Sequence, residues 1–340
     1  MPARFLELEP DRRALAFEQA GTQRGVHPGI VEKDFWVTWL LKILFSHGEL
    51  GPHLVFKGGT CLSKVFGVID RFSEDLDISV APEFVGCDTT EIKALTSRSK
   101  RDRAMRQMQD NCIDKARSTI VPLMEAAAVE LLGPPKSSWI TFEVDPQSQS
   151  PTLLFHYPTH TAGLDYIRRA VKVELGSLTD QEPTRRAPVR PWVADAYPQL
   201  FPDWTCEVTA LELSRSFWEK ATILHSEFHR PADQATPDRY ARHYSDVARL
   251  LVLPDAAAFL QDRERCARVA QWKALFYARA WARYDLACHG SFRLVPADAR
   301  KAALQADYET MQPMFLTQPP PFKEVLERLA SAEENINGQR

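Results

Sequence analysis

The chain has 340 residues, which is long for one compact domain and suits two subdomains. Its formal net charge is −3, so any nucleic-acid surface must be a local basic patch. The six cysteines form no Cys-x-x-Cys pair, which argues against a zinc ribbon or a disulfide framework. Neither a signal peptide nor a membrane-spanning run is predicted, and we expect a cytoplasmic protein.

The first part of the chain predicts two helices. Asp11 to Ala20 is a short helix, and Gly21 to Gly29 is a break. Gly29 to Ser46 carries apolar side chains over a wide arc, which is typical of a largely buried helix. Its charged residues Lys33 and Asp34 have two open interpretations. They approach a functional site, or they form a charged turn on the outer face of a core helix.

Residues 54–80 contain the most informative stretch. Leu54 to Phe56 is a short apolar run, suited to a buried strand. Lys57 to Thr60 follows, and its Gly-Gly pair allows a sharp turn and a close approach of the backbone to a ligand. Cys61 to Ile69 has helical spacing, with Thr60 placed to cap it. The free N–H groups of this helix start predict an anion site.

The stretch ends in a predicted strand, Glu74 to Val80. Its apolar residues share one face, and Asp75 and Asp77 share the other. Two carboxylates side by side can hold divalent metal ions, which clamp the attacking and leaving oxygens of a phosphoryl displacement. The alternative is an exposed edge strand after an ordinary turn. The phosphate-binding turn and the Asp-x-Asp pair, occurring together in this order, favour nucleotidyl transfer.

Residues 91–132 are predicted to be mainly helical, with a basic first half. A charge run is usually a solvated helix face, and the alternative is a patch that follows the phosphates of a nucleic acid. A Gly-Pro-Pro break follows this region. The basic residues are Arg98, Lys100, Arg101, Arg103 and Arg106.

Three strands are predicted next, at 139–144, 152–157 and 167–175. The last alternates clearly and places Lys172 and Glu174 on its polar face. Glu174 is the candidate third carboxylate, which would deprotonate the attacking hydroxyl or complete a metal site. The alternative is a Lys–Glu surface pair.

Residues 178–204 are rich in Pro and Arg and predict an irregular surface connection. Arg185, Arg186 and Arg190 make it a second candidate for nucleic-acid contact. From Thr209 the pattern is helical. We therefore predict a core at 1–205, a helical subdomain at 206–330 and a disordered tail at 331–340.

The order of strand, Gly-Gly-Thr, helix and Asp-x-Asp strand resembles the nucleotidyltransferase superfamily of DNA polymerase beta. More closely, KGGTCLSKVFGVIDRFSEDLDISV at 57–80 resembles the AbiEii/AbiGii toxins of type IV toxin–antitoxin systems. Residues 211–225 resemble a further motif of that family, in which a lysine reaches the nucleotide phosphates, and residues 238–251 resemble another. The resemblance implies an α+β fold, with a mixed-sheet nucleotidyltransferase core and a helical C-terminal subdomain.

The residues and the resemblance together predict the site. The predicted catalytic and metal-binding residues, for Mg²⁺ or Mn²⁺, are Asp75, Asp77 and Glu174. The predicted nucleotide-binding residues are Lys57, Gly58, Gly59, Thr60, Ser73, Lys172 and Lys220. The predicted supporting residues are Glu219, Arg242 and Asp246. Arg242 and Asp246, at i and i+4, are expected to pair on one helix face.

The resemblance also implies an activity and partners. The chain is expected to be a toxin that transfers an NMP from an NTP to an acceptor hydroxyl, the tRNA 3′ end, with release of pyrophosphate. It would arrest growth as part of a type IV toxin–antitoxin system or a phage-defence system that acts by abortive infection, controlled by an antitoxin encoded nearby. Two alternatives stay open: transfer to a protein hydroxyl, and a nucleotide-binding module without turnover. The third acid, Glu174, argues against a module that only binds nucleotide, because binding alone does not need this acid.

Overall fold

The protein, described here from a computed structural model, is defined over residues 3–161 and 168–338. It divides into two compact units: Met1–Val65 with Phe72–Leu211, and Phe66–Arg71 with Glu212–Arg340. The predicted boundary at 205 is therefore displaced. Residues 207–211 stay with the first unit because they form a strand of its sheet, and the short segment Phe66–Arg71 belongs to the second.

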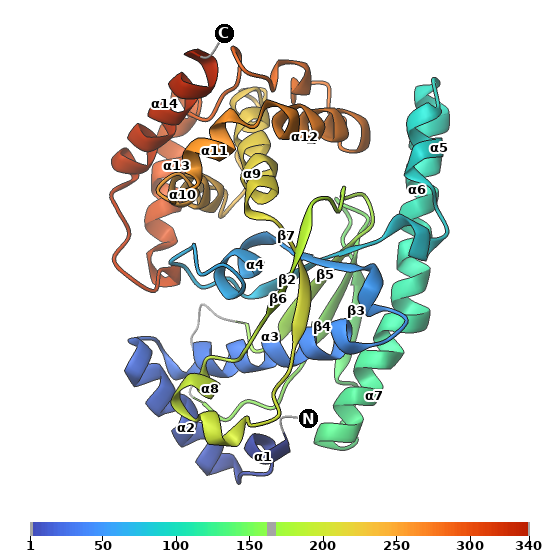
Figure 1. Cartoon of the computed structure of the whole chain (residues 1–340), viewed down its shortest axis with the longest axis vertical. Helices are drawn as coiled ribbons and strands as arrows, with labels where there is room; N and C mark the ends of the chain where they lie inside the picture. Colours follow the sequence, from blue (N-terminus) through green and yellow to red (C-terminus); the bar gives the residue numbers. More distant parts are fainter. Residues whose placement is uncertain (1–2, 162–167, 339–340) are drawn as a thin grey trace. The chain divides into compact units, whose positions relative to one another are not determined.

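The first unit is built on a seven-stranded mixed sheet of order β3-β4-β5-β2-β1-β7-β6 (Figure 1). The pairs β2–β5 and β1–β7 are parallel, and the other neighbours are antiparallel. This mixed sheet with helices confirms the predicted α+β class. The strands are β1 Leu54–Lys57, β2 Asp75–Val80, β3 Ile140–Val144, β4 Pro151–Phe155, β5 Val171–Gly176, β6 Thr184–Pro188 and β7 Glu207–Leu211.

The helix α3 (Pro28–Ser46) forms the centre of this unit's core and contacts β5 and β7. Trp36 and Trp39 both pack on the Phe155 ring, with ring centroids 5.6 and 5.3 Å away. The predicted burial of this helix is confirmed. The other helical segments of the first unit are α1 Ala3–Leu6, α2 Pro10–Arg24, η1 Gly51–His53, α4 Gly58–Lys64, η2 Pro82–Val85, α5 Thr89–Ala94, α6 Arg98–Lys115, the π-helical η3 Ala116–Ile120, α7 Val121–Leu132, α8 Val193–Ala196 and η4 Pro198–Leu200.

The second unit is helical, as predicted for the C-terminal part. Its helix α9 (Leu213–Phe228) packs against α10 (Ala241–Leu250) and α12 (Arg263–Phe276), and α10 also contacts α13 (Asp298–Thr310) and α14 (Phe322–Gly338). The remaining elements are α11 Ala256–Gln261, η5 Tyr284–Leu286 and η6 Gln312–Met314.

Several sequence predictions about local structure are wrong. The predicted break from Gly21 to Gly29 is shorter than expected: α2 continues to Arg24 and ends at Gly25, whose φ is +68°, and α3 starts at Pro28. The connection at 178–204 is not wholly irregular, since it contains β6 with Arg185 and Arg186 on the sheet edge. The third predicted strand starts only at Val171, and residues 162–167 lie outside the described chain.

The prediction that the chain is disordered from residue 331 is also wrong. The helix α14 continues to Gly338. Leu329, Ala332 and Ile336 are all buried, and their helical spacing extends the apolar stripe to the end of the helix. The polar composition of the tail hid this stripe. Within residues 3–161 and 168–338, no helix combines the length and apolar character needed to cross a bilayer.

Candidate active site

The turn between β1 and α4 can be formed only by glycine at Gly58. Its φ is +78°, in the left-handed region, and an added Cβ would overlap with the carboxylate of Asp77. The helix α4 starts at Gly58 itself, with Lys57 at the N-cap position. The predicted cap by Thr60 is therefore wrong, because the helix begins two residues earlier than the apolar spacing indicated. The backbone at Gly58 and the Asp77 carboxylate lie against each other.

Thr60 instead links α4 to the start of β2. Its side chain is buried, and its hydroxyl donates to the backbone carbonyl of Asp75 at 2.5 Å. The same hydroxyl lies 3.0 Å from the Ser73 hydroxyl. The Thr60 side chain therefore fixes the position of the strand residue that carries the first predicted metal ligand.

The predicted acids lie in a row across neighbouring strands. In the parallel pair β2–β5, Asp77 is opposite Glu174 and Asp75 is opposite Lys172. In the antiparallel pair β1–β2, Lys57 is opposite Asp77. Residues in register on adjacent strands project from the same face, about 4.8 Å apart. The predicted adjacency of the two acidic strands is confirmed, and the catalytic roles remain predictions.

The charges of this row are only partly balanced. Lys172 forms an ion pair with Glu174 on the same strand. Burial alone would lower the pKa of Lys172, but its hydrogen bond to Glu174 and the charges of Glu174 and Asp75 raise it overall. Burial raises the pKa of Asp75, and the nearby carboxylates of Glu74 and Glu174 raise it further. The charges of Lys172 and Lys33 lower this pKa without cancelling the increase.

The donor set fits a hard divalent cation. Within 3–161 and 168–338, no three His, Cys, Asp or Glu side chains are arranged to hold a metal ion, and Glu174 is turned to Lys172. Asp75 and Asp77 nevertheless offer oxygen ligands of the kind that Mg²⁺ and Mn²⁺ prefer. A bound cation would also relieve the crowding of carboxylates around Asp75. Glu174 would join this set only after leaving Lys172.

In the second unit, Lys220 and Asp246 form a buried cluster with Arg71. The Asp246 carboxylate accepts two hydrogen bonds from Arg71, at 2.8 and 2.7 Å, and one from Lys220 at 2.8 Å. Asp246 is thus paired with Arg71 and Lys220, and the predicted pair with Arg242 is wrong. The planar guanidinium of Arg71 binds both carboxylate oxygens of Asp246, and Lys220 binds one of them as well.

This cluster keeps its charges despite burial. Burial alone would raise the pKa of Asp246, but Arg71 and Lys220 outweigh it and hold that pKa well below its usual range. Burial lowers the pKa of Lys220, and Asp246 counteracts this effect. Asp246 thus favours the charged form of the Lys220 ammonium, against the effect of burial.

Glu219, the predicted supporting acid next to Lys220, has other partners. Its carboxylate accepts hydrogen bonds from Arg215 at 2.6 and 3.0 Å and lies 3.2 Å from the ammonium of Lys273. The contact with Arg215 lies within α9, and the contact with Lys273 connects α9 to α12. The support that Glu219 gives to Lys220 is therefore indirect: Glu219 holds α9, the helix on which Lys220 lies.

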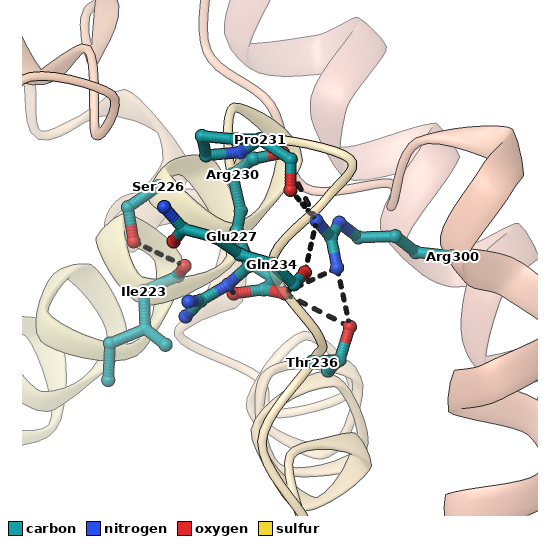
Figure 2. A network of polar contacts seen from close by, with 8 residues as sticks. All are labelled: Ile223, Ser226, Glu227, Arg230, Pro231, Gln234, Thr236 and Arg300. Carbon is teal, nitrogen blue, oxygen red and sulfur yellow. Dashed lines mark hydrogen bonds and ion pairs between the residues drawn. The ribbon is translucent and has the colours of Figure 1, made fainter.

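A second network in this unit fixes the loop that leads to α10, the helix of Arg242 and Asp246 (Figure 2). Glu227 is fully buried and accepts a hydrogen bond from Arg230 at 2.7 Å. Arg300 of α13 reaches the carbonyls of Arg230, Pro231 and Gln234 at 3.1, 2.6 and 3.0 Å. A single guanidinium thus holds the backbone of the loop.

Replacing Arg300 with methionine should destabilise the protein by about 3–5 kcal/mol, because it removes one partner from a buried charged network. Chemical denaturation measures this loss. Lys301→Met is the matched control, since Lys301 is half-exposed and its partner Asp298 lies at the surface. An Arg300→Met protein as stable as the control would show that the network adds no stability.

Arg71 is the site residue that sequence reasoning missed. It lies four residues before Asp75 and is buried in the helical unit rather than in the unit of the sheet. The only signal in the sequence was an arginine inside the central stretch. Its partner Asp246 is 175 positions away, and nothing local indicates that pairing.

Comparison with known proteins identifies one family whose model matches this chain. A family model described as "Nucleotidyl transferase AbiEii toxin, Type IV TA system" matches residues 39–328. No curated protein matches the sequence. Among solved structures, JHP933 from Helicobacter pylori is 13% identical with a TM-score of 0.41, covering 95% of this chain and 93% of that one. MenT4, nucleotidyltransferase toxin Rv2826c from Mycobacterium tuberculosis H37Rv, is 16% identical with a TM-score of 0.46, covering 95% and 99%.

Proposed function

The chain belongs to the AbiEii family of nucleotidyltransferase toxins of type IV toxin–antitoxin systems, and from this premise we propose that it transfers an NMP to the 3′ end of tRNA. The family implies an NTP substrate and an antitoxin partner. The observation that carries the proposal is the row of Lys57, Asp77 and Glu174 beside the turn at Gly58. It joins a backbone turn suited to phosphate with acids suited to a divalent cation.

Binding of the nucleotide would use the following groups. The backbone N–H groups of Gly58 and Gly59 and the ammonium of Lys57 would neutralise phosphate charge. Ser73 would donate a hydroxyl near the start of β2, where it already contacts Thr60. The phosphate-binding role of Lys220 stays a prediction from the family resemblance; in the second unit its ammonium donates to Asp246.

The chemical step is a displacement at the α-phosphorus. The oxygen of the acceptor hydroxyl forms a bond to the α-phosphorus, and the bond to the bridging oxygen of the β-phosphate breaks. The electron pair leaves with pyrophosphate. Glu174, once released from its ion pair with Lys172, accepts the hydroxyl proton, and the freed ammonium of Lys172 neutralises phosphate charge. Mg²⁺ or Mn²⁺, bound by Asp75, Asp77 and Glu174, would supply charge neutralisation.

Incubating the protein with each labelled NTP and either total tRNA or total protein tests this proposal. Label on tRNA supports it, and label only on protein would mean that the acceptor is a protein hydroxyl. Binding of NTP without transfer to either acceptor would indicate a nucleotide-binding module. Growth arrest on expression, relieved by a co-expressed neighbouring antitoxin, would support the toxin role, and protection of cells carrying both genes against phage would support a role in phage defence by abortive infection.

If tRNA is the acceptor, its binding should weaken steeply with salt. Each lost phosphate contact lowers the slope of log K against log salt by about 0.7–0.9. Charge reversal of one arginine cluster should therefore reduce the slope by about 2–3 and leave NTP binding intact. The two triple variants are R98E/R101E/R103E on α6 and R185E/R186E/R190E around β6.

Each triple variant is the matched control for the other, because both carry the same change in charge. Filter binding of tRNA at several salt concentrations measures the slopes. Unchanged slopes in both variants would place the tRNA surface elsewhere or favour a protein acceptor. One arginine of each cluster has a surface partner: Arg186 lies 2.9 Å from Glu207, and Arg98 lies 3.9 Å from Asp102.

A further inference from the structure

The helix α3 contains three consecutive charged residues that are all buried. Glu32, Lys33 and Asp34 have exposed fractions of 1%, 1% and 2%. The interpretation of Lys33 and Asp34 as an outer charged turn is therefore wrong. Burying a charge is costly unless the group is paired and hydrogen-bonded. The partners of these residues therefore indicate what the burial achieves.

Lys33 connects the two strands that carry the predicted catalytic acids. Its ammonium donates to the Glu74 carboxylate at 2.5 Å and to the Arg168 carbonyl at 2.9 Å. Glu74 immediately precedes Asp75, the first residue of β2. Arg168 lies three residues before β5, the strand of Glu174. One buried group therefore holds both strands near their starts.

Asp34, the next residue, holds the end of the helix that follows the glycine turn. Its carboxylate accepts from Lys64 at 2.6 Å and from the backbone N–H of Trp192 at 2.7 Å. Lys64 is the last residue of α4, and it also donates to the Arg190 carbonyl at 2.8 Å. The element that carries the glycine turn is thus attached to the position adjacent to Lys33.

We propose that Lys33 and Asp34 are positioning residues, which set the glycine helix α4 and the acidic strand β2 against each other from one rigid helix. Adjacent residues of a helix have a fixed separation, so their two ion pairs hold the two elements at a fixed separation. The hydrogen bond from Thr60 to the Asp75 carbonyl completes this frame. Supporting contacts of this kind decide whether a site keeps a productive geometry.

Glu32 provides the contrast on the same helix. Its carboxylate accepts hydrogen bonds from the backbone N–H groups of His160 and Thr161, at 2.7 and 3.2 Å, and from the Thr161 hydroxyl at 2.5 Å. None of these partners belongs to α4 or β2. Glu32→Gln therefore changes a buried charge on α3 without touching the two elements.

The test compares stability with activity in Lys33→Met, Glu74→Gln and the double variant K33M/E74Q. Breaking a buried pair at one side destabilises strongly because it leaves an uncompensated buried charge, whereas removing both charges together leaves none. The double variant should therefore recover the melting temperature of the wild type. Its kcat should stay about 10²-fold low, the cost of a misplacement of about 1 Å. Lys33→Arg should restore part of the rate, because arginine can still donate to Glu74.

The activity part of this test rests on the proposed function, because it measures nucleotide transfer. Transfer is measured at a temperature well below unfolding. Glu32→Gln should keep its kcat even if its melting temperature falls. Glu74→Gln alone should lower kcat by less than the double variant does, since Lys33 still has an oxygen to bind. Recovery of both melting temperature and kcat in K33M/E74Q would overturn the proposal.

Amide hydrogen exchange tests the same positioning without any activity. In K33M/E74Q, exchange should speed up in residues 72–77, and in D34N/K64M it should speed up in residues 58–65. If the wild type transfers no nucleotide, the proposed function fails, but this exchange pattern still decides the positioning. Exchange that is unchanged in both segments would contradict the proposal.

Discussion

Replacing Asp77 with asparagine is expected to abolish nucleotide transfer while leaving the fold intact. The Asp77 carboxylate lies between Lys57 and Glu174 and against Gly58, the turn proposed to bind phosphate. Asparagine keeps the shape that fits against this glycine but removes the charge that a divalent cation requires. Loss of one acid from a catalytic set can cost on the order of 10⁴-fold in rate, and we expect a loss of this size.

The same variant tests the predicted metal ligands. With NTP present, Mg²⁺ or Mn²⁺ should raise the melting temperature of the wild type, because a ligand that binds only the folded state stabilises it. Asp77→Asn should lose most of this gain. Asp110→Asn, an exposed position on α6, is the matched control and should behave like the wild type. An unchanged metal response in Asp77→Asn would place the cations elsewhere.

Replacing Glu174 with glutamine should lower the rate of transfer by about 10²–10⁴-fold, the usual contribution of a general base. Glutamine can still accept a hydrogen bond from Lys172, so the local arrangement on β5 is kept. The affinity for NTP should change little, because the glycine turn and the lysines are proposed to hold the phosphates. The expected effect is therefore on kcat, with little change in the binding constant.

Glu143→Gln provides a control within the same row of the sheet. Glu143 is opposite Thr152, which is opposite Glu174, so the two acids lie about 10 Å apart, two strand spacings, on one face. At equal expression, the wild type and Glu143→Gln should arrest growth, and Glu174→Gln should not. Full toxicity of Glu174→Gln would remove Glu174 from the proposed chemistry.

Local patterns in the sequence predicted the centre of the fold. The alternation of β2 separated Asp75 and Asp77 from their apolar neighbours, and the same period placed Glu174 on the polar face of its strand. These predictions succeed because a strand repeats every two residues and each face has its own environment. The glycine pair was equally readable, since Gly58 adopts a positive φ that other residues rarely adopt.

Contacts between distant segments could not be predicted. Arg71 binds Asp246 and Lys33 binds Glu74, yet these pairs are separated by 175 and 41 positions. Charged side chains usually lie at the surface, so the sequence alone left open whether Lys33 lies on an exposed face or approaches a functional site. Only tertiary packing reveals that each of these charges is buried with a partner.

The central claim is nucleotidyl transfer to tRNA, and paired labels on one NTP test it most directly. The protein is incubated with tRNA, a divalent cation, and the NTP labelled either at its α-phosphate or at its γ-phosphate. We predict that the α-label appears at the tRNA 3′ end and that the γ-label is released as pyrophosphate, with neither result for Asp77→Asn. Transfer of the γ-label to the acceptor, or no label on tRNA from any NTP, would contradict the account.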